Sequence, residues 1–160
     1  MPFTPLQPLT PVRLAYLTEE VNDELTSEWP EDSDEALQMA AGNQFIESFM
    51  LNYSVTASYS KSPKTDFRRL QSKSKKSPYI WEIRTGPPIT KIRRVPGIRI
   101  IGAFSEADCF IGLGIEPRDT IDFEVASKRA MAKWVSLFSP YNPILSEDIN
   151  DYIKENVVRL

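Results

Sequence analysis

The longest regular pattern of hydrophobic residues lies between residues 33 and 53 and predicts a helix. Apolar side chains recur there at every fourth position, which places them on one helix face. They are Leu37, Ala41, Phe45, Phe49 and Tyr53. At the start of the segment, Asp32 and Glu35 have the spacing of a capping box, with Asp in place of the usual Ser or Thr. We expect this helix to turn its apolar stripe toward the core.

Two shorter elements precede this helix. Residues 12–17 alternate between apolar and polar side chains, as in a short strand. A helix over residues 19–28 follows, with Thr18 as its expected cap, acidic residues in its first turn and Pro30 after its end. Residues 1–11 carry a proline at every third position, which is typical of polyproline II. We interpret them as an extended arm; a ligand for a proline-reading groove is the less favoured alternative.

Four short runs rich in β-branched and aromatic residues predict strands. They cover residues 79–84, 89–95, 98–104 and 109–115. Because the runs follow one another closely, we expect an antiparallel meander. Before them, one or two helical turns are expected around residues 67–70. Residues 72–78 contain no apolar side chain, which predicts an exposed loop.

A last pair of helices is expected after the strands. The first begins at Thr120 or Asp122 and ends near Phe138, because apolar residues again recur every fourth position and prolines follow. The second is short and begins at Ser146. The predicted fold is a single α+β domain over residues 1–160, with N-terminal helices packed on a four-stranded, mainly antiparallel sheet and C-terminal helices after it. Its sections are the arm (1–11), the N-terminal strand and helices (12–60), the basic sheet and helix (61–138) and a helical tail (139–160).

The composition excludes several chemistries. The 160 residues are 41% hydrophobic and 26% charged, as in an ordinary globular domain. The chain has no histidine, which rules out Ser-His-Asp triads and histidine-ligated metals. Cys109 is the single cysteine, so an internal disulfide or a zinc cluster is excluded and inert packing is expected. No apolar run reaches the roughly 18 residues of a membrane span, and no signal-peptide pattern opens the sequence. We therefore predict a cytoplasmic protein without metal or cofactor.

Charge is distributed very unevenly along the chain. The net charge is −3, but residues 1–40 contain nine acidic side chains and one basic side chain, whereas residues 61–100 contain twelve basic and two acidic ones. A stretch with a charge of +10 attracts phosphate groups if its charges share one face. The alternative is a well-solvated loop and sheet surface. The acidic segment either masks the basic face or adds helices on the far side.

Four segments of the basic region occur in an order that resembles a known family. They are Phe67-Arg68-Arg69-Leu70, Trp81-Glu82-Ile83-Arg84, Arg99-Ile100-Ile101-Gly102-Ala103-Phe104 and Cys109-Phe110-Ile111-Gly112-Leu113. With Arg118 and a helix after the last strand, this order over residues 60–138 resembles the RelE/HigB-like toxins of type II toxin–antitoxin systems, including the phage-type HigB branch. The resemblance implies a metal-independent endoribonuclease that cleaves messenger RNA, often on the ribosome, and is held in check by a cognate antitoxin protein.

In such an enzyme a 2′-hydroxyl attacks the adjacent phosphate, and arginine or lysine stabilises the charge that develops. The resemblance implies catalytic roles for Arg84, Arg99 and Arg118. Six further basic residues are expected to bind the RNA backbone: Lys73, Lys75, Lys76, Lys91, Arg93 and Arg94. Glu82 could act as a base only on the basic face, and a salt bridge to Arg84 is the favoured interpretation.

Two alternatives stay open at this point. One is a catalytically inactive module of the same fold that binds nucleic acid or a protein partner through its basic sheet. The other is a protein whose fold is unrelated to these toxins. In either, the arginines are polar residues on the outer face of a sheet whose other face is buried.

Overall fold

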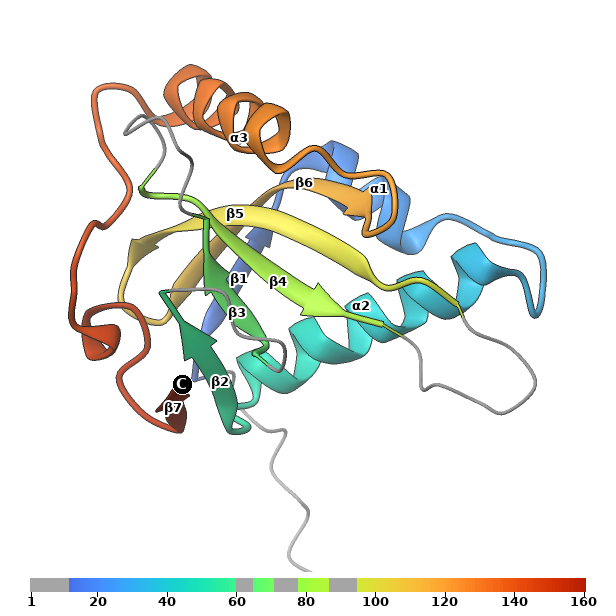
Figure 1. Ribbon diagram of the computed structural model, residues 1–160, viewed down its shortest axis with the longest axis horizontal. Helices are drawn as coiled ribbons and strands as arrows, with labels where there is room; N and C mark the ends of the chain where they lie inside the picture. The colour runs from blue at the N-terminus through green and yellow to red at the C-terminus, as the bar shows by residue number, and fades with distance from the viewer. Residues whose placement is uncertain (1–11, 60–64, 71–77, 87–94) are drawn as a thin grey trace, which may run out of the picture.

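The computed structural model describes residues 12–59, 65–70, 78–86 and 95–160 (Figure 1). The helices are α1 (Glu19–Thr26), α2 (Asp34–Met50) and α3 (Phe123–Phe138), with a 3-10 turn η1 (Ile149–Asp151). The strands are β1 (Leu14–Leu17), β2 (Val55–Ser58), β3 (Phe67–Arg69), β4 (Trp81–Thr85), β5 (Ile98–Glu106), β6 (Cys109–Pro117) and β7 (Val157–Arg159). Within these residues no helix is long and apolar enough to cross a membrane.

All seven strands form one mixed sheet in the order β1-β6-β5-β4-β3-β2-β7. The neighbours from β3 to β6 are antiparallel, while β1 joins β6, and β2 joins both β3 and β7, in parallel. The sheet curls into a half-barrel (Figure 1). The predicted four-stranded, mainly antiparallel sheet is therefore wrong, because segments far apart in the chain add parallel strands at both edges.

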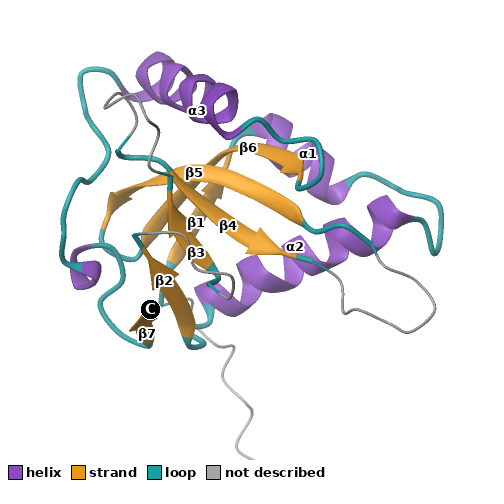
Figure 2. Cartoon of the chain, in the orientation of Figure 1, coloured by secondary structure: helices purple, strands orange, loops and turns teal. Residues whose placement is uncertain are grey.

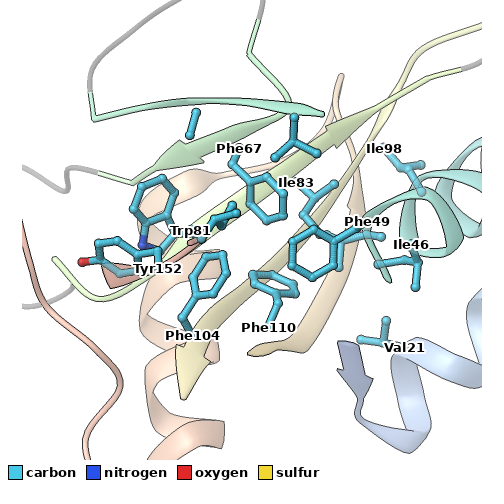
Figure 3. Close-up of a cluster of buried hydrophobic side chains, with 14 of the residues drawn as sticks. Val21, Ile46, Phe49, Phe67, Trp81, Ile83, Ile98, Phe104, Phe110 and Tyr152 are labelled. Carbon is cyan, nitrogen blue, oxygen red and sulfur yellow. The ribbon is translucent and has the colours of Figure 1, made fainter. Parts of the chain in front are cut away.

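The helices cover the two faces of the sheet unequally (Figure 2). α1 and α2 pack on one face, where Val21, Ile46 and Phe49 join a large aromatic core (Figure 3). In that core the rings of Phe67 and Phe104 have centroids 5.6 Å apart. α3 packs on the other face, where its buried residues meet a second, mainly aliphatic cluster. Side chains that follow one another along a central strand therefore pack in different hydrophobic clusters.

Several predicted elements are confirmed and others are wrong. The strand at 12–17, the helices at 19–28, 33–53 and 122–138, and the strands at 79–84, 98–104 and 109–115 are present with shifted ends. Residues 67–70 form β3 instead of a helical turn, β2 was not predicted, and the helical tail is η1 followed by β7. The strand predicted at 89–95 lies outside the described residues apart from Val95, and β4 pairs directly with β5. β2 was missed although residues 53–60 alternate between apolar and polar side chains, whereas β3 and β7 have only three residues each and show no alternation.

The capping residues and buried face of α2 differ from the prediction. Ser33, and not Asp32, caps it by accepting a hydrogen bond from the Ala36 backbone N–H. The buried face is centred on Met39, Gly42, Ile46 and Phe49, whereas Leu37 and Tyr53 are exposed. Gly42 lets the helix approach Leu25 and Ile98 closely, which turns the helix away from the predicted stripe. Similarly, Thr18 stands before α1 but makes no capping bond, whereas Asp122 caps α3 as expected.

The buried side chain of Arg13 links segments that are far apart in the sequence. The Arg13 guanidinium donates hydrogen bonds to the carbonyl oxygens of Tyr53 (2.9 Å) and Glu155 (2.6 Å), and it lies 5.1 Å from the Phe49 ring centroid. Tyr53 follows α2, and Glu155 precedes β7. The Arg13 side chain therefore connects the first strand to the C-terminal segment. Burial lowers the pKa of Arg13, against the attraction of Asp108 and Glu155.

Gly102 marks an irregularity in the β5–β6 hairpin. The register shifts between Ile101 and Gly102, and Gly102 then faces Gly112. A Cβ atom on Gly102 would overlap the carbonyl oxygen of Ile111 and lie 2.6 Å from Phe110 Cζ. Only glycine permits this approach of the two strands.

We expect Gly102→Ala to lower the free energy of unfolding by about 2 kcal/mol, since the added methyl overpacks a filled interior. Gly114→Ala is the matched control in β6, because its Cβ would have no other atom within 4 Å. Its unfolding free energy should stay within about 0.5 kcal/mol of the parent. Urea denaturation followed by circular dichroism measures both; equal effects of the two substitutions would contradict the close approach at Gly102.

Candidate functional site

A buried carboxylate lies at the centre of the basic region. On β4, Trp81 and Ile83 point into the aromatic core, so Glu82 and Arg84 project from the opposite face, toward α3. The Glu82 side chain has no solvent exposure. A buried charge is tolerated only with close partners of opposite charge.

Three arginines from three adjacent strands provide those partners. Arg68 Nε of β3 lies 2.5 Å from Glu82 Oε1, and Arg99 Nε of β5 lies 3.2 Å from Oε2. Arg84 Nε, on β4 itself, lies 3.8 Å from Oε1. The register explains this convergence, since Arg68 is opposite Glu82 across β3–β4 and Arg84 is opposite Arg99 across β4–β5. We call Glu82 and these three residues the arginine cluster.

A fourth arginine stands beside the cluster. Arg118 follows β6 directly, is exposed, and donates its backbone N–H to the Gly97 carbonyl at the start of β5 (2.9 Å). Burial lowers the pKa of Arg84 and of Arg99, and the positive charge of Arg118 adds to the lowering of both. The cluster alone carries three positive charges against one negative charge, and Arg118 adds to this excess.

Burial shifts the pKa values of the charged groups in the cluster. Burial raises the pKa of Glu82, against the attraction of Arg68, Arg99 and Arg84. Burial also lowers the pKa of Arg99 to about 10, opposed by Glu82 and reinforced by the neighbouring arginines. A protonated Glu82 would leave three close guanidiniums without a counter-charge. The ionised carboxylate is therefore the form that the cluster requires.

The members of the cluster differ in accessibility. The side chains of Arg68 and Arg84 are each 17% exposed, and that of Arg99 is 7% exposed. Arg68 lies against the Phe123 ring (5.2 Å to its centroid), and Arg84 Nη1 donates to Thr65 Oγ1 (3.3 Å). Arg99 donates from Nη1 to the Ile98 carbonyl (2.9 Å). Arg68, Arg84 and Arg118 can therefore meet a ligand, while Arg99 supports them from below.

The three residues predicted to be catalytic, Arg84, Arg99 and Arg118, come together at this site. The favoured interpretation of Glu82 as a salt-bridge partner of Arg84 is confirmed, and the same carboxylate also pairs with Arg68 and Arg99. Because Glu82 is fully buried, it cannot reach a substrate hydroxyl as a base. The six residues predicted to bind the RNA backbone lie outside the described residues: Lys73, Lys75, Lys76, Lys91, Arg93 and Arg94.

Arg68 was missed as a site residue. Its segment was expected to be helical, which hid its place opposite Glu82. The segment Phe67-Arg68-Arg69-Leu70 shows no alternation of apolar and polar residues, and Arg69 is itself buried and pairs with Glu147 elsewhere. Because two arginines are adjacent on a strand of three residues, the sequence does not show which of them faces the arginine cluster.

The acidic helices and the arginine cluster occupy different faces of the sheet. α2 and the buried residues of α1 pack on the aromatic core, while Glu20 of α1 reaches α3 and pairs with Lys133.

Across the described ranges, no group of three or more acidic or cysteine side chains is placed to hold a metal ion. The chain matches no protein-family model, no curated protein and no solved structure.

We expect Glu82→Gln to lower the free energy of unfolding by about 3–5 kcal/mol, because it leaves three buried or half-buried guanidiniums without their shared counter-charge. Glu124→Gln is the matched control, since Glu124 is 55% exposed and pairs with the exposed Lys128 at 2.7 Å. An exposed pair of this kind contributes at most about 1 kcal/mol. Chemical denaturation at pH 7 compares the two, and a small effect of Glu82→Gln would contradict the assigned role.

Proposed function

We propose that this protein binds single-stranded RNA and that the arginine cluster, with Arg118, holds the phosphate groups. The observation that carries the proposal is the gathering of three arginines around one buried carboxylate, which leaves an excess of two positive charges. A partly buried excess of charge favours an anionic ligand. RNA is chosen over other phosphate compounds because of the resemblance described above and the +10 charge of residues 61–100.

The geometry of the ion pairs supports phosphate binding. All three contacts to Glu82 are made through the inner Nε atom of a guanidinium. The outer Nη atoms are suited to paired hydrogen bonds with phosphate oxygens. Glu82 thus holds the guanidiniums in place and neutralises only one of their three positive charges.

A second candidate function is metal-independent cleavage of messenger RNA, on the ribosome and under the control of an antitoxin. One observation favours it: Arg84 and Arg99 are directly opposite each other on neighbouring strands, so two cations lie close to one bound phosphate. Such an arrangement stabilises the charge that develops during attack by a 2′-hydroxyl. The cleavage step also needs a proton acceptor, and Glu82 is too deeply buried to be one. Binding is therefore the function that the geometry supports best.

RNA binding is tested by fluorescence anisotropy with a labelled single-stranded oligonucleotide over a range of salt concentrations. We expect Arg118→Ala and Arg84→Ala each to weaken binding and to reduce the slope of log affinity against log salt by about one, as for the loss of one phosphate contact. Lys154→Ala is the matched control, because Lys154 is exposed beside the β5–β6 turn, at the opposite end of β6 from Arg118. Equal losses in all three variants, or no binding by the parent, would overturn the proposal.

Cleavage is tested separately by mapping new 5′ ends of messenger RNA in a translating extract. New ends inside reading frames with the parent protein, lost with Arg118→Ala despite retained folding, would support the ribonuclease. Arg99→Ala is less suited to this test because Arg99 is paired with Glu82 and supports the fold. Unchanged messenger RNA together with intact RNA binding would reject cleavage and keep the binding function.

A further inference from the structure

A cavity of about 320 Å³ adjoins the arginine cluster. It lies between the middle of α2, which contributes Gln44 and Phe45, and the residues beside β3 and β4, which contribute Asp66, Arg84 and Thr85. Arg84, near the end of β4, borders both places: its Nε lies 3.8 Å from Glu82, and the residue is part of the cavity lining. A ligand whose phosphate meets the cluster can therefore place its next chemical group in this cavity.

The cavity lining combines flat and polar surfaces. The Phe45 ring and the Arg84 guanidinium are the kinds of group on which RNA bases stack. The Thr85 hydroxyl is buried and makes no hydrogen bond within the described part of the chain. Asp66 Oδ2 accepts hydrogen bonds from the backbone N–H (2.8 Å) and hydroxyl (3.1 Å) of Thr56, so both are received by one carboxylate oxygen.

We propose that this cavity holds a guanine base of the bound RNA and that Asp66 recognises it; the proposal rests on the RNA-binding function above. An ionised aspartate only accepts hydrogen bonds. With Oδ2 engaged by Thr56, Oδ1 is the atom for the ligand. Guanine carries two adjacent donors, N1–H and the N2 amine, on its Watson–Crick edge, and one carboxylate oxygen has lone pairs for both. Gln44 offers an amide N–H for the guanine carbonyl.

The other bases fit this lining less well. Adenine and cytosine place a ring acceptor beside their amino group, and that acceptor would face the Asp66 carboxylate. Uracil has a single ring N–H between two carbonyls. A buried polar group left without its partner discriminates strongly against the wrong ligand.

The test uses four heptanucleotides, UUUNUUU, with G, A, C or U at the centre, and measures binding to the full chain by anisotropy. We expect the G oligonucleotide to bind about tenfold more tightly than the others, the discrimination of a paired base contact. Asp66→Asn retains an oxygen for Thr56 but replaces the other acceptor with a donor. It should abolish the preference for G without weakening binding to the all-U oligonucleotide.

Two further variants separate this inference from a folding effect. Gln44 is exposed on α2, so Gln44→Ala should leave the fold intact and reduce the preference for G. Asp23→Asn, on the exposed side of α1, is the matched control and should retain the full preference. Binding of all four oligonucleotides with equal affinity would overturn the guanine site alone. Failure of every oligonucleotide to bind would overturn the RNA-binding function itself.

Discussion

The burial of one carboxylate among three guanidiniums is the interaction on which the functional region depends. Glu82 occupies the middle of a central strand, where water cannot solvate it, and so it requires cations from both neighbouring strands. Arg68, Arg84 and Arg99 meet that requirement only in the observed register of β3, β4 and β5. The register in which β3, β4 and β5 pair is therefore also the register that brings the three arginines to Glu82. Because one negative charge organises three positive ones, the site retains its attraction for anions.

The two faces of the sheet carry different sets of side chains. The same strands place Phe67, Ile83 and Ile100 in the aromatic core and Arg68, Glu82 and Arg99 on the other face. The core includes most of the large buried aromatic side chains, which contribute more apolar burial than other residues. This core holds the strands rigidly, and rigid elements keep guanidiniums in place more accurately than loops do. At the far end, Arg13 joins the first strand to the C-terminal segment through backbone carbonyls.

The overall charge of the protein gives a misleading impression of its ligand. A net charge of −3 disfavours binding to RNA on average, but the acidic residues are concentrated in the first forty positions, whose two helices pack on the aromatic core. The local field at the arginine cluster is set by the nearby arginines, by Glu82 and by Glu116, which is opposite Arg99 on β6. The cavity beside Arg84 then adds uncharged and acidic groups, which suit a base more than a second phosphate. In our proposal, phosphate binding and base recognition therefore belong to neighbouring but different surfaces.

The sequence by itself determined the features that depend on local pattern. The alternation in β4 separates Trp81 and Ile83 from Glu82 and Arg84, the fourfold spacing predicts α2 and α3, and the lack of histidine limits the chemistry. Only the tertiary structure decided that residues 67–69 are a strand, that β1, β2 and β7 lie in parallel at the edges, and that Arg68 joins Glu82. The alternation over residues 12–17 and 53–60 marks β1 and β2 as strands, whereas β3 and β7 contain only three residues each, too few to define a period. Their conformation comes from hydrogen bonds to partners distant in the chain, and no local pattern records those partners.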